Sequence, residues 1–402
     1  MQTHLSDAAR QLPRAEEAER ILRACVHCGF CTATCPTYQL LGDELDGPRG
    51  RIYLIKQALE GAAVTASSQR HLDRCLSCRS CETTCPSGVE YHNLLDIGRA
   101  VVDQQVARPL AQRLLRHGLR AVVPRPALFK ALVRGGQALR PLLPGSLKAK
   151  LATNAGGQRP APRHPRRILL LEGCVQQALA PNTNAAASRL LDRLGISVEP
   201  IAEAGCCGAV DYHLDAQAQG LARARRNIDA WWPAIQAGAE AIVQTASGCG
   251  AFVRDYGHLL AHDPGYAAKA ARVSALSRDL VQVLEAEPVE QLGLCAEQRL
   301  AVHCPCTLQH ALRLGGAVER LLARLGFHLT EVPDGHLCCG SAGTYSLTQP
   351  GLARQLRDNR LAALESGSPD LIATANIGCQ LHLGGAGRTP VRHWIEIVEA
   401  AL

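Results

Sequence analysis

Short apolar runs alternate with helix-like stretches along the second half of the chain. Two of these runs, Ile168–Leu171 and Leu300–Val302, have the length and composition of strands and lead into a cysteine a few residues later. Two more strand-like runs, AIVQTASGC and LIATANIGC, both end on Gly-Cys. Strands that alternate with helices predict parallel α/β layers.

This half of the sequence is also duplicated. The spacing from Cys174 to Cys206 is 32 positions, and the spacing from Cys306 to Cys338 is again 32. Each interval contains an LLxRLG helix end and finishes in Cys-Cys-Gly, and the repeats close on the similar segments SRDLVQVLEA and VRHWIEIVEA. We therefore predict two related α/β lobes, over residues 166–290 and 299–402, with cysteines at strand ends converging near the interface between the lobes.

The first half has a helical pattern instead. Gly50–Glu60 and Tyr91–Ala107 are expected to form helices in a small all-α domain over residues 1–107. The stretch Thr153–Pro165, with the sequence TNAGGQRPAPRHP, has the composition of a linker. The predicted fold class is thus α + α/β, with an all-α domain followed by a duplicated α/β domain.

Length and composition fit a globular protein of two or three domains. The chain has 402 residues, of which 47% are hydrophobic and only 3% aromatic, so aliphatic side chains must fill the cores. Met1–Leu12 has no apolar segment of the signal-peptide type, and no apolar run approaches the roughly 20 residues that a membrane-spanning helix needs. We expect a cytoplasmic protein whose membrane contact, if it has any, is peripheral.

The net charge of +7 comes from one segment. Between Gln104 and Leu171 there are fourteen Lys and Arg residues and not one Asp or Glu. The leucines of this segment alternate with arginines as in an amphipathic helix, with breaks at prolines 124, 126, 141 and 144. Residues 108–165 are thus a basic connector, which either binds anionic lipid or an acidic partner subunit, or is a solvated link whose leucines cover a neighbouring domain. Nucleic acid is not expected, because no recognition motif accompanies the charge.

The N-terminal third contains the same cysteine pattern twice, C-x-x-C-x-x-C-x-x-x-C-P. The first copy consists of Cys25, Cys28, Cys31 and Cys35, and the second consists of Cys75, Cys78, Cys81 and Cys85. This spacing is typical of two 4Fe-4S clusters, in which the fourth cysteine of each run ligates the other cluster. By that rule Cys25, Cys28, Cys31 and Cys85 hold one cluster, and Cys75, Cys78, Cys81 and Cys35 hold the second.

Eight cysteines can also form disulfides or bind zinc. Disulfides are disfavoured because nothing in the sequence directs the chain to an oxidising compartment. Tetrahedral zinc needs only two C-x-x-C pairs and has no use for the third cysteine or for the fourth that precedes proline. A zinc protein would be colourless and free of labile sulfide.

The two lobes contribute a second set of cysteines at matched positions. These are Cys174, Cys206, Cys207 and Cys249 in the first lobe, and Cys306, Cys338, Cys339 and Cys379 in the second. We interpret them as a metal-ligand set, with Gly208 and Gly340 allowing the backbone to approach a bulky cofactor. The alternative is that they are ordinary buried cysteines. Cys295 and Cys304 have no counterpart in the other repeat and are treated as bystanders.

The motifs together resemble known iron-sulfur proteins. The first half resembles the two-cluster ferredoxin domain of respiratory iron-sulfur subunits, and the second resembles the cysteine-rich CCG domains of heterodisulfide reductase. Their fusion is similar to the iron-sulfur subunits of glycolate oxidase, anaerobic glycerol-3-phosphate dehydrogenase and lactate-utilisation complexes. The strings ILRACVHCGFCTATCPTYQLLGDELDGPRGRIYLIKQ, AGCCGAVDYHL, HCPCTLQHAL, HLCCGSAGTYSLT and VRHWIEIVEAAL closely resemble the glycolate oxidase iron-sulfur subunit family.

The resemblance implies a role in electron transfer. FAD-containing partner subunits would oxidise glycolate to glyoxylate, and this chain would carry the electrons to an acceptor such as a membrane quinone, at the cytoplasmic face of the inner membrane. No residue of the chain is then expected to be catalytic, and no strand-G-x-G-x-x-G-helix motif for a dinucleotide is present. Iron-sulfur subunits of lactate or glycerol-3-phosphate dehydrogenase complexes are the nearest alternatives.

The CCG half departs from the pattern of heterodisulfide reductase, which ends in C-x-x-C and binds noncubane clusters through five cysteines. Here Phe252 and His382 occupy the last position of that pattern, so each lobe lacks one thiolate. A single additional cluster, another ligand set that includes His382, and a cysteine site without a cluster all stay open. The missing cysteine also argues against a rival function, reduction of a disulfide or thiol at the CCG site.

Overall fold

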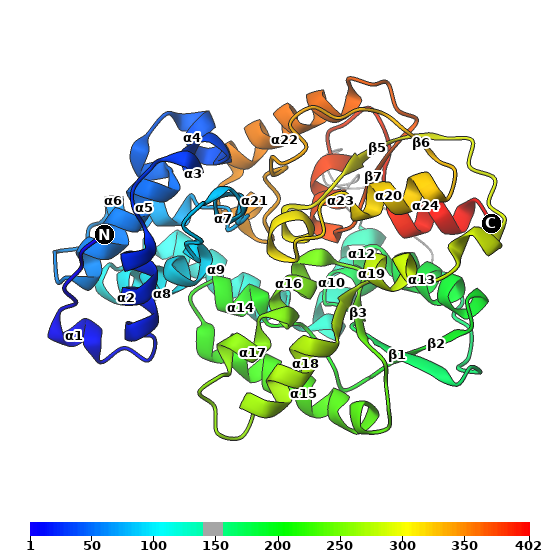
Figure 1. Ribbon diagram of the computed structural model, residues 1–402, viewed down its shortest axis with the longest axis horizontal. Coiled ribbons are helices and arrows are strands. Elements are labelled where there is room, and N and C mark those ends of the chain that lie inside the picture. Colours follow the sequence, from blue (N-terminus) through cyan, green and yellow to red (C-terminus); the bar gives the residue numbers. More distant parts are fainter. Residues whose placement is uncertain (140–155) are drawn as a thin grey trace. The chain divides into compact units, whose positions relative to one another are not determined.

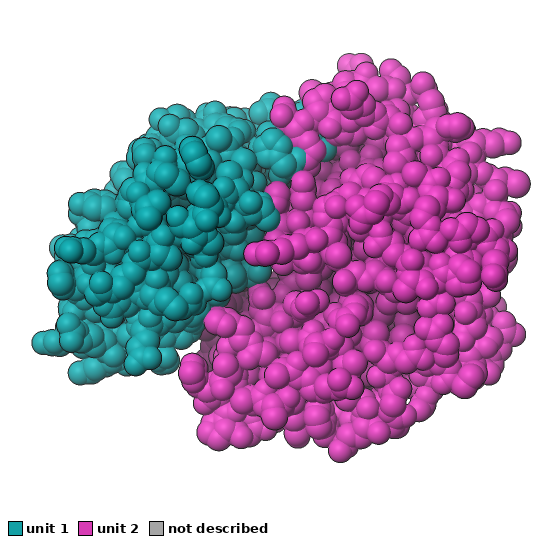
Figure 2. Space-filling model, in the orientation of Figure 1, with its two compact units in different colours: residues 1–116, 336–360 teal, residues 117–335, 361–402 magenta. Residues whose placement is uncertain are grey.

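The computed structural model describes residues 1–139 and 156–402 (Figure 1). The chain divides into two units, which Figure 2 shows in different colours. Unit 1 comprises residues 1–116 and 336–360, and unit 2 comprises residues 117–335 and 361–402. Part of the predicted linker, Thr153–Ala155, and the predicted helix breaks at Pro141 and Pro144 lie outside the described residues.

Unit 1 is helical. Its helices are α1 (Asp7–Arg10), α2 (Ala15–Ala24), α3 (Phe30–Ala33), α4 (Pro36–Leu41), η1 (Glu44–Asp46), α5 (Pro48–Leu59), α6 (Ala66–Asp73), α7 (Ser80–Thr84), α8 (Tyr91–Gln105), most of α9 (Leu110–Val122), α21 (Tyr345–Thr348) and most of α22 (Pro350–Glu365). Residues 1–116, all of them described, contain no strand. This confirms the prediction of an all-α first domain, including the helices expected near residues 50–60 and 91–107.

The crossing of α5 and α8 forms the core of unit 1. Helix α5 begins with Pro48, whose fixed φ suits the first helical position, and it places Ile52, Ile55 and Leu59 on one buried face. Gly98 on α8 allows the two helices to approach closely, because a Cβ there would lie 2.5 Å from the Ile55 side chain. Burial of each such aliphatic side chain contributes about 1.5–3 kcal/mol, which fixes the helices that carry the cysteine loops.

Unit 2 contains two parallel four-stranded sheets, one in each lobe. The first lobe contains β1 (Arg166–Leu170), α12 (Gln176–Leu179), α13 (Pro181–Arg193), β2 (Ile196–Pro200), α14 (Ala209–His213), α15 (Gln217–Gln236), β3 (Ile242–Gln244), α16 (Ser247–Arg254), α17 (Tyr256–Leu259), α18 (Ala267–Leu276), β4 (Ser277–Asp279), α19 (Leu280–Glu285) and η3 (Val289–Leu292). The second contains β5 (Arg299–His303), η4 (Thr307–Ala311), α20 (Ala317–Arg324), β6 (His328–Leu329), β7 (Leu371–Thr374), α23 (Ile377–Gly384), β8 (Val391–His393) and α24 (Trp394–Ala400).

The two sheets have the same topology. The strand orders are β2-β1-β3-β4 and β6-β5-β7-β8, and every pairing is parallel. In register, Ile242 of β3 lies opposite Leu169 of β1 and Ile372 of β7 lies opposite Ala301 of β5. This confirms the predicted α + α/β fold class and the duplication.

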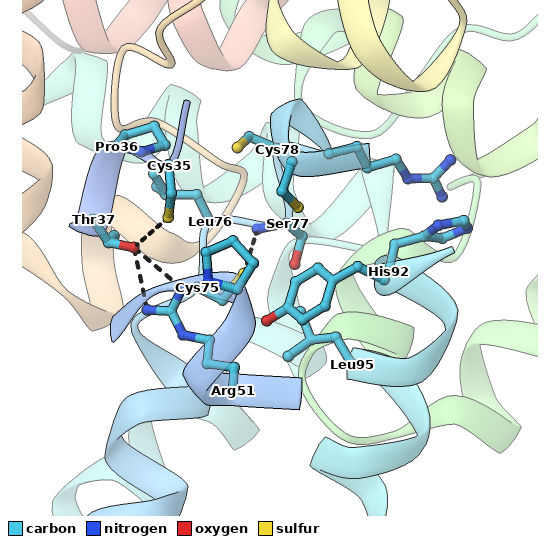
Figure 3. A pocket seen from close by; sticks show the side chains of 14 residues that line it. Cys35, Pro36, Thr37, Arg51, Cys75, Leu76, Ser77, Cys78, His92 and Leu95 are labelled. Carbon is cyan, nitrogen blue, oxygen red and sulfur yellow. Dashed lines mark hydrogen bonds between the residues drawn. The ribbon is translucent and has the colours of Figure 1, made fainter. Parts of the chain in front are cut away.

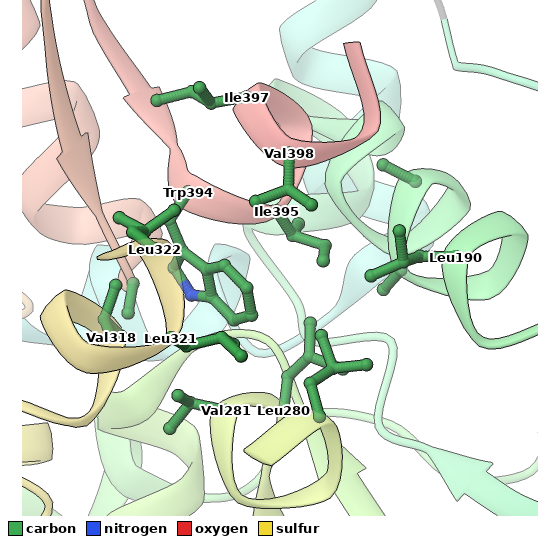
Figure 4. Packing of buried hydrophobic residues seen from close by; sticks show 14 of the residues in the cluster. Leu190, Leu280, Val281, Val318, Leu321, Leu322, Trp394, Ile395, Ile397 and Val398 are labelled. Carbon is green, nitrogen blue, oxygen red and sulfur yellow. The ribbon is translucent and has the colours of Figure 1, made fainter. Parts of the chain in front are cut away.

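The lobes share one hydrophobic core in unit 2. Figure 4 shows the Trp394 indole among aliphatic side chains of both lobes, including Leu280 and Val281 from α19 and Leu321 from α20. Trp394 and these three residues have no measurable exposure. The Trp394 ring is thus surrounded by Leu, Val and Ile, in keeping with the expectation that aliphatic side chains fill the cores of a chain with few aromatic residues.

Polar contacts also join the two lobes. The Ser247 amide donates to the Ala375 carbonyl at 3.2 Å, and the hydroxyls of Ser247 and Thr307 are 2.7 Å apart. The His393 Nε2 is 2.7 Å from the Thr245 carbonyl oxygen. Burial lowers the pKa of His393 to about 4, so this contact is made by a neutral imidazole that donates its proton to the carbonyl.

The basic segment contains two helices in its described part, α9 and α10 (Pro126–Ala138). The break between them falls at Pro124, as predicted, and Pro126 takes the first position of α10. No helix in the described residues is both long enough and apolar enough to cross a bilayer.

Candidate iron-sulfur sites

Four cysteines of unit 1 line one cavity (Figure 3). Cys75, Cys78 and Cys81 come from the end of α6, the following loop and α7, and Cys35 comes from the residue before α4. The cavity therefore takes three cysteines from the second run and one from the first.

A neighbouring cavity has the reciprocal lining. Cys25, Cys28 and Cys31 surround it from the end of α2 to α3, and Cys85 enters from the end of α7. The structure thus brings the eight cysteines together in the same two sets that the crossing rule predicts. Their ligation of iron stays a prediction.

The two cysteine loops share one backbone conformation. Positive φ angles occur at His27 and Gly29 in the first loop, and at Ser77 and Arg79 in the second, two and four residues after the first cysteine of each run. Residues other than Gly rarely adopt positive φ angles, so the repetition of these angles at matched positions reflects a shared constraint on the two loops. In the second loop the Ser77 amide points to the Cys75 sulfur at 3.4 Å, which is how a backbone stabilises a thiolate ligand.

Burial disfavours the ionised form of these thiols unless positive charge lies nearby. Burial raises the pKa of Cys31 to about 11 and raises the pKa of the fully buried Cys81 well above its ordinary value. The pKa of Cys25 is raised for the same main reason. A thiolate in such a cavity needs nearby positive charge, and four sulfur donors facing one space supply the ligand set that an iron-sulfur cube requires. The residues therefore fit the group.

The two cavities are adjacent. Pro48, Cys81 and Tyr91 line both of them, so a single layer of side chains separates the two thiol groups. The cavity lined by Cys28 lies nearer the surface, because Cys28 is exposed whereas Cys78 and Cys81 are buried.

A buried cation lies beside the cavity lined by Cys35 and Cys75. Arg51, from the first turn of α5, is 1% exposed and donates to the Thr37 hydroxyl at 3.2 Å. That hydroxyl is 3.3 Å from the Cys35 sulfur, as Figure 3 shows. The Arg51 guanidinium also pairs at 3.4 Å with Asp46, a fully buried carboxylate. Arg51 therefore links the cavity to a buried polar network.

Anionic groups hold the charge on this guanidinium. Burial alone would lower the pKa of Arg51, but Cys75, Tyr91, Cys35 and Asp46 raise it above its ordinary value. The positive charge is thus fixed at the edge of the thiol group. The cysteine pattern did not point to Arg51. Its position on the apolar face of α5, one turn before Ile55, does indicate a buried charge.

The first lobe brings its four cysteines together. Neighbouring thiols influence one another's ionisation in the order Cys174, Cys206, Cys207 and Cys249. The neighbouring thiols lower the pKa of Cys206, while the same contacts and burial raise the pKa values of Cys174 and Cys207. Cys249 belongs to α16 and packs beside Ala246 and Ile377, so the thiols lie near the junction of the lobes, as expected.

The missing fifth cysteine is replaced by a packed ring. Phe252, on α16 one turn after Cys249, is 4% exposed and lies 5.3 Å from the Tyr212 ring and 5.8 Å from the Tyr256 ring. Gly208, the glycine of the Cys-Cys-Gly sequence, was expected to let the backbone approach a cofactor, but the structure gives another reason for a glycine at this position. A Cβ at Gly208 would lie 2.5 Å from the Gly220 carbonyl oxygen of α15, so the close approach is to a helix.

The second lobe's cysteines are divided between the units. Cys338 and Cys339 belong to unit 1, and Cys306 and Cys379 belong to unit 2. Cys338 accepts from the Gly340 amide at 3.4 Å, and Cys379 accepts from the Asn376 side chain at the same distance. Cys295 is exposed and Cys304 is buried. His382 follows Cys379 by three residues on α23 and is half-buried.

Tyr345 is a further residue that sequence analysis missed. Its hydroxyl donates to the Arg74 carbonyl at 3.1 Å within unit 1. Burial raises the pKa of Tyr345, and the nearby sulfurs of Cys75 and Cys338 raise it further. The loop after Cys338 thus reaches the cysteines of the second run inside unit 1. Only its place in a string shared with the family could have indicated this.

Comparisons with known proteins agree with these sites. Residues 21–89 match the family described as a 4Fe-4S dicluster domain, and residues 168–254 and 300–384 match the family described as a cysteine-rich domain. Both families cover the cysteine groups described above.

Relatives match over most of the chain. The glycolate oxidase iron-sulfur subunit of Escherichia coli (strain K12) is 69% identical over 404 residues, which cover 100% of this chain and 99% of the relative. The probable glycolate oxidase iron-sulfur subunit of Bacillus subtilis (strain 168) is 30% identical, over 92% of this chain and 89% of the relative. Lactate utilization protein A of Geobacillus kaustophilus is 28% identical over 54% of this chain and 90% of the relative. The chain belongs to the family of glycolate oxidase iron-sulfur subunits.

Proposed function

We propose that this chain is the electron-transfer subunit of a glycolate dehydrogenase complex, which oxidises glycolate to glyoxylate. The observation that carries the proposal is a pair of adjacent four-cysteine cavities. They occur in a chain that is 69% identical to a glycolate oxidase iron-sulfur subunit. The nearest alternatives are subunits of lactate or glycerol-3-phosphate dehydrogenase complexes. The lower identity and coverage of the lactate utilization protein make the first of these less favoured.

Cys25, Cys28, Cys31 and Cys85 would hold one 4Fe-4S cluster, and Cys35, Cys75, Cys78 and Cys81 the other. When bound, such clusters accept and release electrons one at a time, which suits them to a donor that releases electrons in pairs. The residues of the chain fix the two groups next to each other, bury seven sulfurs partly or wholly, and leave Cys28 exposed for exchange with a partner.

The partners of this function are other subunits of the complex. FAD-containing subunits would oxidise the substrate, and a quinone or another acceptor would receive the electrons at the cytoplasmic face of the inner membrane. The domain division into residues 1–107, 108–165, 166–290 and 299–402 is part of the same proposal. It agrees with the matches at residues 21–89, 168–254 and 300–384.

The CCG cysteines would provide a third metal or cluster site. Support comes from the first lobe, where Cys174, Cys206, Cys207 and Cys249 interact thiol to thiol in a mainly buried group. Three buried thiols and the half-buried Cys249 lose solvation when they ionise, and a bound metal would supply the compensating positive charge. Cys306, Cys338, Cys339 and Cys379 are the corresponding candidates of the second repeat.

The test removes one cysteine from each cavity in the assembled complex. Cys28→Ala and Cys78→Ala should each abolish one of two cluster signals in electron paramagnetic resonance and stop glycolate-dependent reduction of the acceptor. Cys295→Ala, at an exposed cysteine of neither group, is the matched control. Normal activity in either variant would contradict the relay, and a complex that oxidises lactate or glycerol 3-phosphate instead of glycolate would move the proposal to the alternatives.

A further inference from the structure

Helix α9 exposes leucines to solvent and directs an arginine toward the protein, which is the reverse of a usual surface helix. Leu110, Leu114 and Leu115 are 67%, 62% and 40% exposed, although amphipathic helices of globular proteins normally turn such residues inward. Arg116 on the same helix is directed to the protein, where it pairs with Asp73 at 3.1 Å and is only 12% exposed. The ion pair therefore fixes the helix with its leucines outward.

The residue that leads into α9 strengthens this orientation. Arg108 is buried and pairs with Asp73 and with Asp103, both from the neighbouring helices α6 and α8. A charged pair that is largely removed from water resists rearrangement, because breaking it leaves an uncompensated charge. The leucine face is thus held in place by the fold.

The next helix repeats the feature. On α10, Leu128 and Leu132 are 42% and 53% exposed and lie one turn apart, while Val133, which points in another direction, is buried. Lys130 and Arg134 are also exposed on this helix. Two consecutive helices therefore each present an apolar stripe to solvent with basic residues beside it.

The charge of the segment indicates which kind of partner binds the exposed leucines. No acidic residue occurs between positions 104 and 171, so basic side chains alone flank the leucines. Two copies of such a face would repel each other, which disfavours a second copy of this chain. Protein interfaces are rich in aromatic side chains and poor in lysine, whereas this face has exposed leucines and Lys130. Aliphatic stripes with basic flanks are the chemistry of helices that lie in the surface of an anionic bilayer.

We propose that α9 and α10 each bind an anionic phospholipid membrane, with the exposed leucines of each helix inserted among the lipid chains and its basic residues at the headgroups. This deepens the proposed function, since it would hold the subunit beside a quinone in the bilayer. Membrane binding itself needs no substrate or electron transfer, so the two proposals can fail separately.

The test is cosedimentation of the purified complex with phosphatidylcholine vesicles that do or do not contain phosphatidylglycerol. We expect binding to the anionic vesicles only, and weakening by at least about tenfold when Leu110, Leu114 and Leu115 are all changed to Ser, because their insertion supplies the apolar term. Leu347→Ser is the control, at a leucine of unit 1 that is 52% exposed. Leu128→Ser with Leu132→Ser should weaken binding in the same way.

The electrostatic part has its own variants. Arg113→Gln, Lys130→Gln and Arg134→Gln together should reduce the dependence on phosphatidylglycerol and on salt, whereas Arg272→Gln, at an exposed arginine of α18, should not. All the changed side chains are exposed, so the fold and iron content should stay normal. Absence of binding by the unchanged complex, equal binding to neutral vesicles, or undiminished binding of the leucine variants would overturn the proposal. Loss of the partner subunits or of a dimer in those variants, with vesicle binding kept, would overturn it in favour of a protein occupant.

Discussion

Replacement of Arg51 by Met should lower the reduction potential of one cluster and leave the other nearly unchanged. The guanidinium is buried, positively charged and attached through Thr37 to the Cys35 sulfur. A fixed positive charge stabilises the state that carries one more electron. Its removal therefore makes reduction of the centre held by Cys35, Cys75 and their partners less favourable.

The magnitude follows from the distances. Because the Thr37 hydroxyl is 3.2 Å from the Arg51 guanidinium and 3.3 Å from the Cys35 sulfur, these two groups are at most about 6.5 Å apart. At an effective dielectric constant of about 20, unit charges at that separation interact by about 2.5 kcal/mol. This corresponds to nearly two factors of ten in the reduction equilibrium, or about 110 mV for one electron.

The assay is a redox titration of the whole complex followed by electron paramagnetic resonance. Arg51→Lys keeps the charge and should retain most of the potential, whereas Asp46→Asn removes the buried negative partner and should shift the potential upward. Arg49→Met removes a more exposed arginine beside the other cavity and is the matched control. Unchanged potentials in Arg51→Met, or equal shifts of the same sign in the Arg51→Met and Asp46→Asn variants, would refute the electrostatic reasoning.

Two further predictions concern unit 2. The folded-state pKa of His393 is lowered to about 4 from 6.5, so the unfolded chain binds a proton that the folded chain does not, and stability present above pH 6.5 should decrease as the pH falls towards 4. Chemical denaturation of wild type and His393→Gln across this range should show a weaker pH dependence in the variant; equal slopes would exclude His393 as the cause. Gly208→Ala should destabilise the fold by more than about 2 kcal/mol, since it combines a positive φ with a Cβ 2.5 Å from a carbonyl oxygen. Gly195→Ala, which has a positive φ but open space around it, should cost about 1 kcal/mol. Chemical denaturation of both glycine variants measures the two losses, and equal losses would argue against the collision.

Local patterns accounted for much of the fold. The run that became β1 and the run that became β5 were recognised because buried parallel strands are continuously apolar, and the helix near residues 50–60 because its apolar residues recur every three or four positions. The matched spacing of 32 residues identified the duplication, and two parallel sheets of identical order confirm it. In these segments the neighbours that decide the conformation are close in sequence.

The site was harder to predict where it depends on distant residues. The spacing of the cysteines indicated which sulfurs belong together, but Arg51 and Asp46 form their buried pair only because α5 and η1 pack against the second cysteine loop. The same holds for Tyr345, which reaches Arg74 across 271 positions. The reason for Gly208 was likewise decided by a helix that begins nine residues later.

The sequence by itself determined the types of element, the repeat and the ligand chemistry, because periodicity and metal-ligand spacing are local properties of the chain. Tertiary structure decided which face each element presents. The leucines of α9 could have covered a core, as one interpretation of the basic segment held, but the pairing of Arg108 and Arg116 with Asp73 turns them to solvent. Such an orientation depends on the free energy of long-range charge pairing and burial, which no local pattern encodes.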